Sequence, residues 1–226
     1  MLMQTSEDYE VALRSCTLCV GILATKPVDP AKSDERVLPR PIVRPLWPRA
    51  VMLIGQAPGL KEYESGNPFS GQAGLEVRSL FAECGCDSSA FEQFVHTSAV
   101  AKCFPGSKLT KRRRGKGFRR EDLKPSGTML KNCRPFLQTQ IDIVAPKLLV
   151  LLGSIALEIY VELRDGKKSK ILLEEYVGRV DEWDGRRVVA LAHTSGGSYW
   201  LNKAENKARQ AQAKSRLTEE LAAALN

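Results

Sequence analysis

The chain has 226 residues, of which 43% are hydrophobic, and a formal net charge of +8 with a pI near 9.2. This length suits one sizeable α/β domain, and no apolar run approaches the roughly 20 residues that a membrane crossing needs. The first residues are acidic and lack the pattern of a secretion signal, so we expect a cytoplasmic protein of a bacterial or archaeal cell. The positive charge fits a merely basic protein, or a polyanionic partner, with nucleic acid ahead of a membrane surface.

Predicted strands and helices alternate along the chain. A helix is expected over 6–19, and a connector with six prolines follows over 24–48. The expected strands are 50–55, a segment within 91–103, 147–153 and 188–192, and the expected helices are 72–85, 126–145, 154–166 and 205–225. Residues 104–126 form a basic loop insertion, and a hairpin is expected at 183–185.

Apolar strands that alternate with helices predict a parallel sheet covered on both faces. The predicted fold is therefore an α/β fold: a three-layer α/β/α sandwich around a central, mainly parallel four-stranded sheet, in a single domain over 1–226. Three motifs follow strands of this sheet: GQAPG at 55–59, TSA at 97–99 and HTSGGS at 193–198. Because ligands bind beyond the carboxyl ends of parallel strands, we expect these motifs to share one rim.

The first motif joins a strand to a glycine-rich loop whose backbone N–H groups can bind an anion or a carbonyl oxygen. It is neither a P-loop nor a dinucleotide-binding motif. On its own, GQAPG also fits a simple turn between a strand and a helix.

A second glycine-rich segment, G-N-P-F-S-G-Q-A-G at 66–74, makes the pattern more specific, and His193-Thr194-Ser195 ends the last strand. Together these segments resemble the uracil-DNA glycosylase superfamily, especially its iron–sulfur branch related to family 4. The resemblance spans roughly residues 12–210. Three residues depart from the pattern: Ala57 stands where one branch has the Asp that activates water, Thr194 stands in place of proline, and Ser98 stands in place of Asn.

The six cysteines are expected to bind a metal or to pack in the core rather than to form disulfides. A Cys-x-x-Cys pair and two distant cysteines supply the four thiolates that a [4Fe–4S] cluster needs, although zinc would use the same set. The resemblance implies a [4Fe–4S] cluster on four cysteines: Cys16, Cys19, Cys103 and Cys133. The other two are expected to pack in the core.

The resemblance also implies a pocket for a flipped base. Phe69 would stack on the base, or else pack in the core, and Ser98 takes the place of the Asn that reads the uracil edge. His193 would donate a hydrogen bond to the base O2, and Gln56 would position a water; these two are the expected catalytic residues. The full base-binding set is Gly55, Gln56, Ala57, Gly59, Phe69, Ser98 and His193.

The DNA backbone is expected to contact two segments. Ser195, Gly196 and Gly197 would hold a phosphate beside the lesion. The basic stretch 107–124 has nine Lys or Arg residues and two acids; it would contact phosphates through Lys111, Arg112, Arg113 and Arg114, unless it is only a solvated loop. Tyr199 or Trp200 would wedge into the duplex or pack.

The implied function is a monofunctional DNA glycosylase of base excision repair. It would hydrolyse the N-glycosidic bond of uracil or another deaminated base. It would act on DNA as a monomer and would have no membrane partner. Because Ser98 is shorter than Asn and pairs once, bases other than uracil are plausible substrates. The alternatives are a non-catalytic iron–sulfur DNA-binding protein on the same fold and a small-molecule hydrolase that uses His193 and Ser195.

Overall fold

The computed structural model describes residues 5–112, 116–193 and 199–226. Its centre is a five-stranded sheet with the order β2-β1-β5-β7-β6. The strands are β1 (Val51–Gly55), β2 (Val95–Ala99), β5 (Leu148–Leu152), β6 (Val180–Trp183) and β7 (Arg186–Leu191). The predicted α/β fold class is therefore confirmed. Four of these strands are parallel, and β6 joins as a fifth, antiparallel strand at the edge.

The fifth strand arises from the predicted hairpin between β6 and β7. Asp184 and Gly185 both have positive φ, 52° and 73°, as the mirror-image turns of tight hairpins require. The sequence over 180–183 is half-polar and lacks the continuous apolar run by which the other strands are predicted. Its place at the sheet edge, paired on one side only, accounts for that composition.

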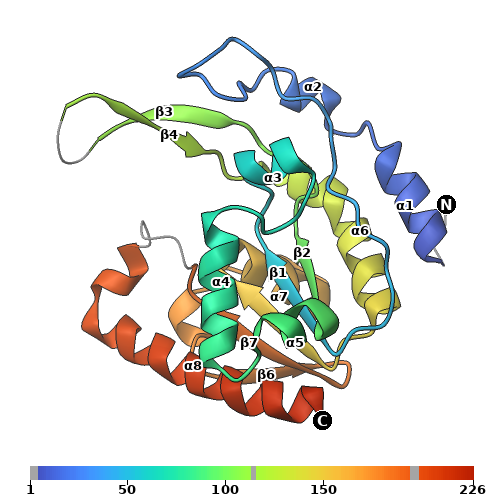
Figure 1. Ribbon diagram of the computed structural model, residues 1–226, viewed down its shortest axis with the longest axis vertical. Coiled ribbons are helices and arrows are strands. Elements are labelled where there is room, and N and C mark those ends of the chain that lie inside the picture. Colours follow the sequence, from blue (N-terminus) through green and yellow to red (C-terminus); the bar gives the residue numbers. More distant parts are fainter. Residues whose placement is uncertain (1–4, 113–115, 194–198) are drawn as a thin grey trace.

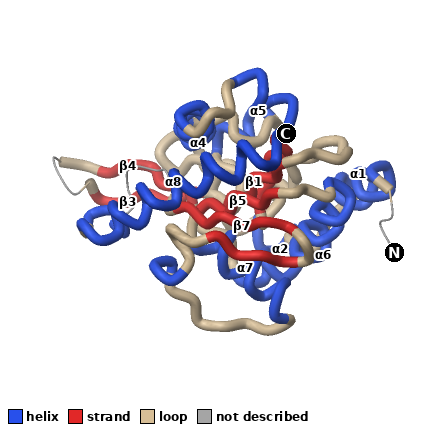
Figure 2. Tube along the Cα trace, turned by 90° about the horizontal axis from the view of Figure 1, so that it is seen from below, coloured by secondary structure: helices blue, strands red, loops and turns tan. Residues whose placement is uncertain are grey.

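Helices cover both faces of the sheet (Figures 1 and 2). One face carries α6 (Gly127–Val144) and α7 (Ser154–Asp165), and α1 (Ser6–Arg14) packs against α6. The other carries α4 (Gln72–Glu83), α5 (Ser88–Phe94) and α8 (Ala204–Leu225). Two short helices, α2 (Val20–Leu23) and α3 (Leu60–Ser65), lie beyond the sheet, and 3₁₀ turns span Leu173–Glu175 and Tyr199–Asn202. No described helix is long and apolar enough to cross a membrane.

Local sequence accounts for the helix boundaries. Asp87 and Ser126 cap α5 and α6, because each side chain accepts a backbone N–H from the first turn. Gly166 ends α7 with a left-handed φ of 70°. The apolar strands β1 and β5 are buried throughout, as expected for central parallel strands. They form the main core together with the inner faces of the helices.

The predicted basic loop differs from the structure in one respect. Two segments of it, β3 (Ser107–Lys111) and β4 (Phe118–Asp122), pair as an antiparallel two-stranded ribbon, which extends away from the central sheet in Figure 1. The connector 24–48 is irregular, with a few turns and one isolated bridge between Pro27 and Arg36. A second, smaller core lies under this connector and includes Leu23, Tyr63 and Phe104.

Candidate active site

A cavity of about 320 Å³ opens at the carboxyl ends of the parallel strands. The three predicted motifs meet there because β1, β2 and β7 all end at the same edge of the sheet. Every residue predicted to bind the base lines this cavity: Gly55, Gln56, Ala57, Gly59, Phe69, Ser98 and His193. The structure thus brings the set together, while the role of each residue stays a prediction.

The Phe69 ring lies directly over the end of β1. A Cβ atom at Gly55 would be 3.0 Å from the ring carbon Cζ, so glycine lets the ring approach the strand. Phe69 adopts a left-handed backbone with φ of 53°, which is rare for a large side chain. Its carbonyl oxygen accepts a hydrogen bond from Arg78 over 3.1 Å. The ring packs against the main core and also lines the cavity, so packing and stacking on a base are compatible.

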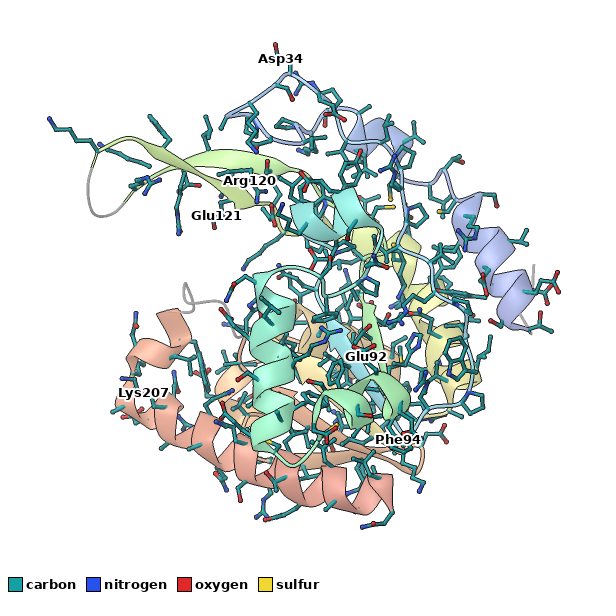
Figure 3. The ribbon with its side chains drawn as sticks, viewed as in Figure 1. Asp34, Glu92, Phe94, Arg120, Glu121 and Lys207 are labelled. Carbon is teal, nitrogen blue, oxygen red and sulfur yellow. The ribbon has the colours of Figure 1, made fainter. Side chains whose placement is uncertain are left out.

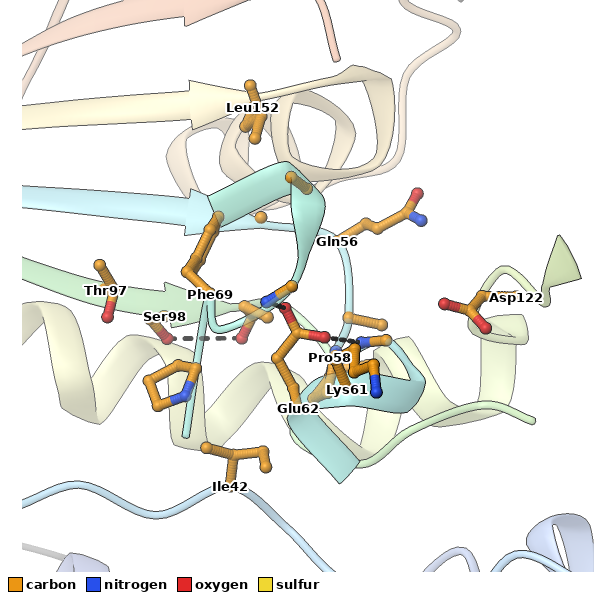
Figure 4. Close-up of a pocket in the computed structure, with 18 of the residues that line it drawn as sticks. Ile42, Gln56, Pro58, Lys61, Glu62, Phe69, Thr97, Ser98, Asp122 and Leu152 are labelled. Atoms are coloured by element: carbon orange, nitrogen blue, oxygen red, sulfur yellow. Dashed lines mark hydrogen bonds between the residues drawn. The ribbon is translucent and has the colours of Figure 1, made fainter. Parts of the chain in front are cut away.

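One carboxylate joins the two glycine-rich loops. Glu62 accepts the Gly59 N–H at Oε2 over 3.0 Å and the Gly71 N–H at Oε1 over 3.2 Å (Figure 4). The side chain of Gln56 points away from the Phe69 ring in the same view. Sequence reasoning missed Glu62, although its position three residues after Gly59, the residue before α3, is a capping pattern.

His193 follows β7 and is half-buried. Its ring lies against Gly153 at the end of β5, where an added Cβ atom would be 3.4 Å from the ring carbon Cδ2. Burial lowers the pKa of His193, and the Glu76 carboxylate acts in the opposite direction. A lowered pKa favours the neutral imidazole, the form proposed to donate to a base oxygen.

The other histidine, His96, lies in β2 and does not line the cavity. It is 6% exposed, and its Nε2 atom has no hydrogen-bond partner among the described residues. Burial lowers its pKa to about 3, with smaller contributions from Lys102, Arg44 and Arg49. His96 is therefore a neutral core residue, and His193 is the histidine of the site.

The floor of the cavity contains a buried lysine that sequence reasoning treated only as the neighbour of a cysteine. Lys102 is 3% exposed, and its Nζ atom lies 2.9 Å from Ser98 Oγ and 2.6 Å from the Ala99 carbonyl oxygen. It also donates to Gln140 of α6. Burial lowers the pKa of Lys102 to about 7, opposed by the nearby Cys133. No local pattern in the sequence marks the lysine or the glutamine as buried, since Gln140 lies among polar residues of α6.

The basic ribbon begins at the cavity wall. Arg120 and Asp122 both line the cavity, and Asp122 Oδ2 accepts the Leu60 N–H over 3.3 Å. Figure 3 shows Arg120 near the root of the ribbon. Lys111 and Arg112, further out, are exposed, as the DNA-contact prediction requires. Arg113 and Arg114 lie outside the described residues.

The loop after His193 also lies outside the description, including Ser195, Gly196 and Gly197. The structure resumes at the 3₁₀ turn Tyr199–Asn202. There Trp200 packs against the main core and donates its ring N–H to Glu174 over 3.3 Å. For Trp200, packing is the arrangement that the structure shows.

The four predicted ligand cysteines lie in one region beyond the sheet. Cys19 and Cys103 belong to the smaller core, and Cys133 lies within α6, in the predicted helix. Cys133 Sγ accepts the Lys102 backbone N–H, and Cys19 Sγ accepts from Asn132, each over 3.4 Å. The pKa of Cys103 is raised to about 12, chiefly by burial and also by the neighbouring Cys133, Cys16 and Cys19.

These contacts bring four thiols near one another. No set of three or more metal-binding side chains within the described ranges is already arranged to hold an ion. The other two cysteines, Cys84 and Cys86, lie in the main core as expected.

The fold and site define an α/β protein with a cavity at the carboxyl ends of its parallel strands, lined by two glycine-rich loops, an aromatic ring and a histidine. Residues 46–221 match the model of the uracil DNA glycosylase superfamily, and the chain belongs to this family. A type-4 uracil-DNA glycosylase of Thermotoga maritima is 30% identical over 161 residues, which are 71% of this chain and 70% of that protein.

A second type-4 uracil-DNA glycosylase, from Pyrobaculum aerophilum, is 29% identical over 121 residues, or 54% of this chain and 53% of its own length. The match thus spans about half of that relative. A third, from Archaeoglobus fulgidus, is 24% identical over 151 residues, 66% of this chain and 67% of that protein. The chain is therefore a divergent member of the family 4 branch.

Proposed function

We propose that this protein is a DNA glycosylase that hydrolyses the N-glycosidic bond of uracil or another deaminated base in DNA. The observation that carries the proposal is the meeting of the two glycine-rich loops, the end of β2 and His193 around one cavity. The membership of the superfamily and the names of the relatives support the same reaction.

The reaction needs the base to leave the sugar as an anion. His193 donates a hydrogen bond to the base O2, where negative charge grows as the bond to C1′ lengthens. Phe69 stacks on the base, and the backbone N–H groups of the 55–59 loop orient it. A base that fills the cavity displaces water from this hydrogen bond, which strengthens it.

The site is less well equipped to activate the attacking water than to stabilise the leaving base. Among the described residues that line the cavity, only Glu62 and Asp122 carry carboxylates. Glu62 accepts two backbone N–H groups, and Asp122 accepts one and pairs with Arg120. Neither is a free general base. We therefore assign the rate acceleration chiefly to departure of the base, with Gln56 positioning the water that attacks the sugar afterwards.

The DNA surface includes the ribbon. Its exposed basic side chains at Lys108, Lys111, Arg112 and Arg119 provide phosphate contacts beside the cavity. Two large apolar side chains of the ribbon, Leu109 and Phe118, are 43% and 63% exposed. An exposed apolar and basic ribbon is suited to the sugars and phosphates of bound DNA. The segment 195–197 is proposed to hold a phosphate near the lesion, and the protein is proposed to act as a monomer.

The four thiols fit a thiolate-bound group by their chemistry, since two of the sulfurs accept N–H groups as bound thiolates do. We propose that Cys16, Cys19, Cys103 and Cys133 hold a [4Fe–4S] cluster. Such a cluster would tie the N-terminal segment to α6 and to the end of β2. It supplies no step of the hydrolysis.

The test is an excision assay. Protein purified without oxygen is incubated with oligonucleotides that carry uracil, hypoxanthine or xanthine, and abasic sites are then cleaved with alkali. We expect cleavage of at least one substrate and its loss in His193→Ala. If no substrate is cut, and His193→Ala binds DNA as the wild type does, the protein is the non-catalytic DNA-binding protein instead. That alternative is favoured by one observation, the absence of a free carboxylate among the described cavity residues.

A further inference from the structure

Three buried polar side chains close the floor of the cavity: Ser98, Lys102 and Gln140, which are 5%, 3% and 4% exposed. They come from the end of β2, from the turn that follows it and from α6. Ser98 Oγ lies 2.6 Å from Gln140 Oε1 and 2.9 Å from Lys102 Nζ, and Lys102 also contacts Gln140 Oε1 and the Ala99 carbonyl oxygen. Every member of this cluster has at least two partners within it.

The positions of the Lys102 and Ser98 hydrogen atoms follow from counting donors and acceptors. A lysine ammonium has three N–H groups, and here they face Ser98 Oγ, Gln140 Oε1 and the Ala99 carbonyl oxygen. The Ser98 hydroxyl then donates to Gln140 Oε1 and accepts from Lys102. No donor of Lys102 is left for a ligand.

The same result holds if Lys102 is neutral. The amine then donates to Gln140 and to the Ala99 carbonyl oxygen, and its lone pair faces Ser98. The Ser98 hydrogen is directed to Lys102 or to Gln140. In both forms that hydrogen stays inside the cluster, so Ser98 offers the cavity an oxygen lone pair.

Because the Ser98 oxygen is a hydrogen-bond acceptor, a base that faces it must present an N–H donor. Deamination of cytosine converts N3 from a lone pair to an imino N–H, and deamination of adenine does the same at N1. An undamaged base of the same shape would set its ring lone pair against the Ser98 oxygen, which leaves two buried acceptors unpaired. The floor can therefore separate a deaminated base from its own parent.

We propose that Lys102 and Gln140 are positioning residues that hold Ser98 as a hydrogen-bond acceptor, and that this acceptor selects the imino N–H of a deaminated base. The proposal rests on the proposed function, because it needs a nucleobase in the cavity. It concerns binding of the base rather than cleavage, so the two can be tested apart.

The experiment measures binding to single-stranded oligonucleotides that carry one 2′-fluoro-2′-deoxyuridine or one 2′-fluoro-2′-deoxycytidine. The fluorine slows cleavage, and a single strand removes differences in base pairing. Fluorescence anisotropy gives the ratio of the two dissociation constants. In the wild type we expect the uracil oligonucleotide to bind roughly 10- to 100-fold more tightly, the cost of an unpaired buried acceptor.

Two variants test the cluster. Ser98→Ala removes the acceptor, and Lys102→Met with Gln140→Leu frees the Ser98 hydroxyl to donate; each should bring the ratio to within about threefold of unity. Ser107→Ala is the matched control, because Ser107 is 1% exposed and donates to the Val28 carbonyl oxygen over 2.6 Å, outside the cavity lining. It should keep the wild-type ratio.

Thermal unfolding followed by circular dichroism checks that each variant folds, and if the double variant does not, Gln140→Leu alone replaces it. Equal binding of both oligonucleotides by the wild type overturns the proposal, whether or not uracil is excised. A wild-type ratio retained in Ser98→Ala or in the Lys102 and Gln140 variant also overturns it. Failure to cleave an ordinary uracil oligonucleotide, with the binding ratio intact, would count against the glycosylase function and not against the floor.

Discussion

Gly74 lies against the backbone of Phe69 so closely that a Cβ atom on Gly74 would be 1.8 Å from the Phe69 carbonyl oxygen. Gly74→Ala must therefore move the loop that carries the Phe69 ring. We expect excision to fall at least tenfold and the free energy of unfolding to fall by about 1–3 kcal/mol. Gly127→Ala is the control, since nothing lies within 4 Å of its added Cβ atom. Equal activity of the two variants would contradict this account of the second glycine-rich loop.

His193 is expected to act on the leaving base and not on DNA affinity. His193→Ala should lower the single-turnover excision rate by about 100- to 1,000-fold, the cost of removing one donor to a developing oxyanion. Binding of undamaged DNA should change little, because the proposed phosphate contacts lie elsewhere. A loss of binding that matches the loss of rate would mean that His193 holds DNA instead.

His96 makes stability depend on pH. Its pKa is lowered to about 3 in the folded protein and is near 6.5 when unfolded, so between these values the unfolded chain binds the extra proton. Stability from this group is complete above pH 6.5 and falls by up to about 1.4 kcal/mol per unit as the pH drops toward 3. Urea unfolding of the wild type and of His96→Leu at pH 7 and 4.5 should show a steeper decline for the wild type; parallel curves would refute it.

The ribbon is expected to contact phosphates. Changing Lys108, Lys111 and Arg119 to Gln should weaken DNA binding and reduce the slope of log K against log salt by about one unit for each contact removed. The three exposed lysines within 167–170 provide a control with the same loss of charge. If both triple variants lower the slope equally, net charge and not the ribbon determines the affinity.

The thiolate proposal predicts different results for two buried cysteines. Cys133→Ser should abolish absorbance near 400 nm and lower the iron content, because α6 would lose its ligand. Cys86→Ser should keep both, since Cys86 lies in the main core. A colourless wild-type protein with stoichiometric zinc would replace the cluster by a zinc site on the same residues.

The strands were predictable because short continuous apolar runs such as 148–152, bounded by turn residues, fit central parallel strands that are buried on both faces. The strand β6 was not counted, since an edge strand paired on one side needs no such run. The sequence predicts a loop at the ribbon because its two strands are rich in charged residues and mostly exposed or half-buried.

The cavity lining was predictable where glycines and a histidine follow strands. The floor was not, because the partners of Ser98 come from positions 4 and 42 residues away. A lysine in a sequence carries no sign that it is buried. Only the packing of α6 beside β2 shows that Lys102 and Gln140 contact Ser98.

The Glu62 carboxylate has a consequence for how this site can change during evolution or by engineering. Because its two oxygens accept the Gly59 and Gly71 N–H groups, displacement of either loop breaks one of the two hydrogen bonds that link the loops. Residues 55–74 therefore form one structural unit. Exchanging only one of its loops with a relative would separate the Phe69 ring from the end of β1. Chimaeric proteins designed to recognise a different damaged base should exchange the whole segment 55–74, including Glu62.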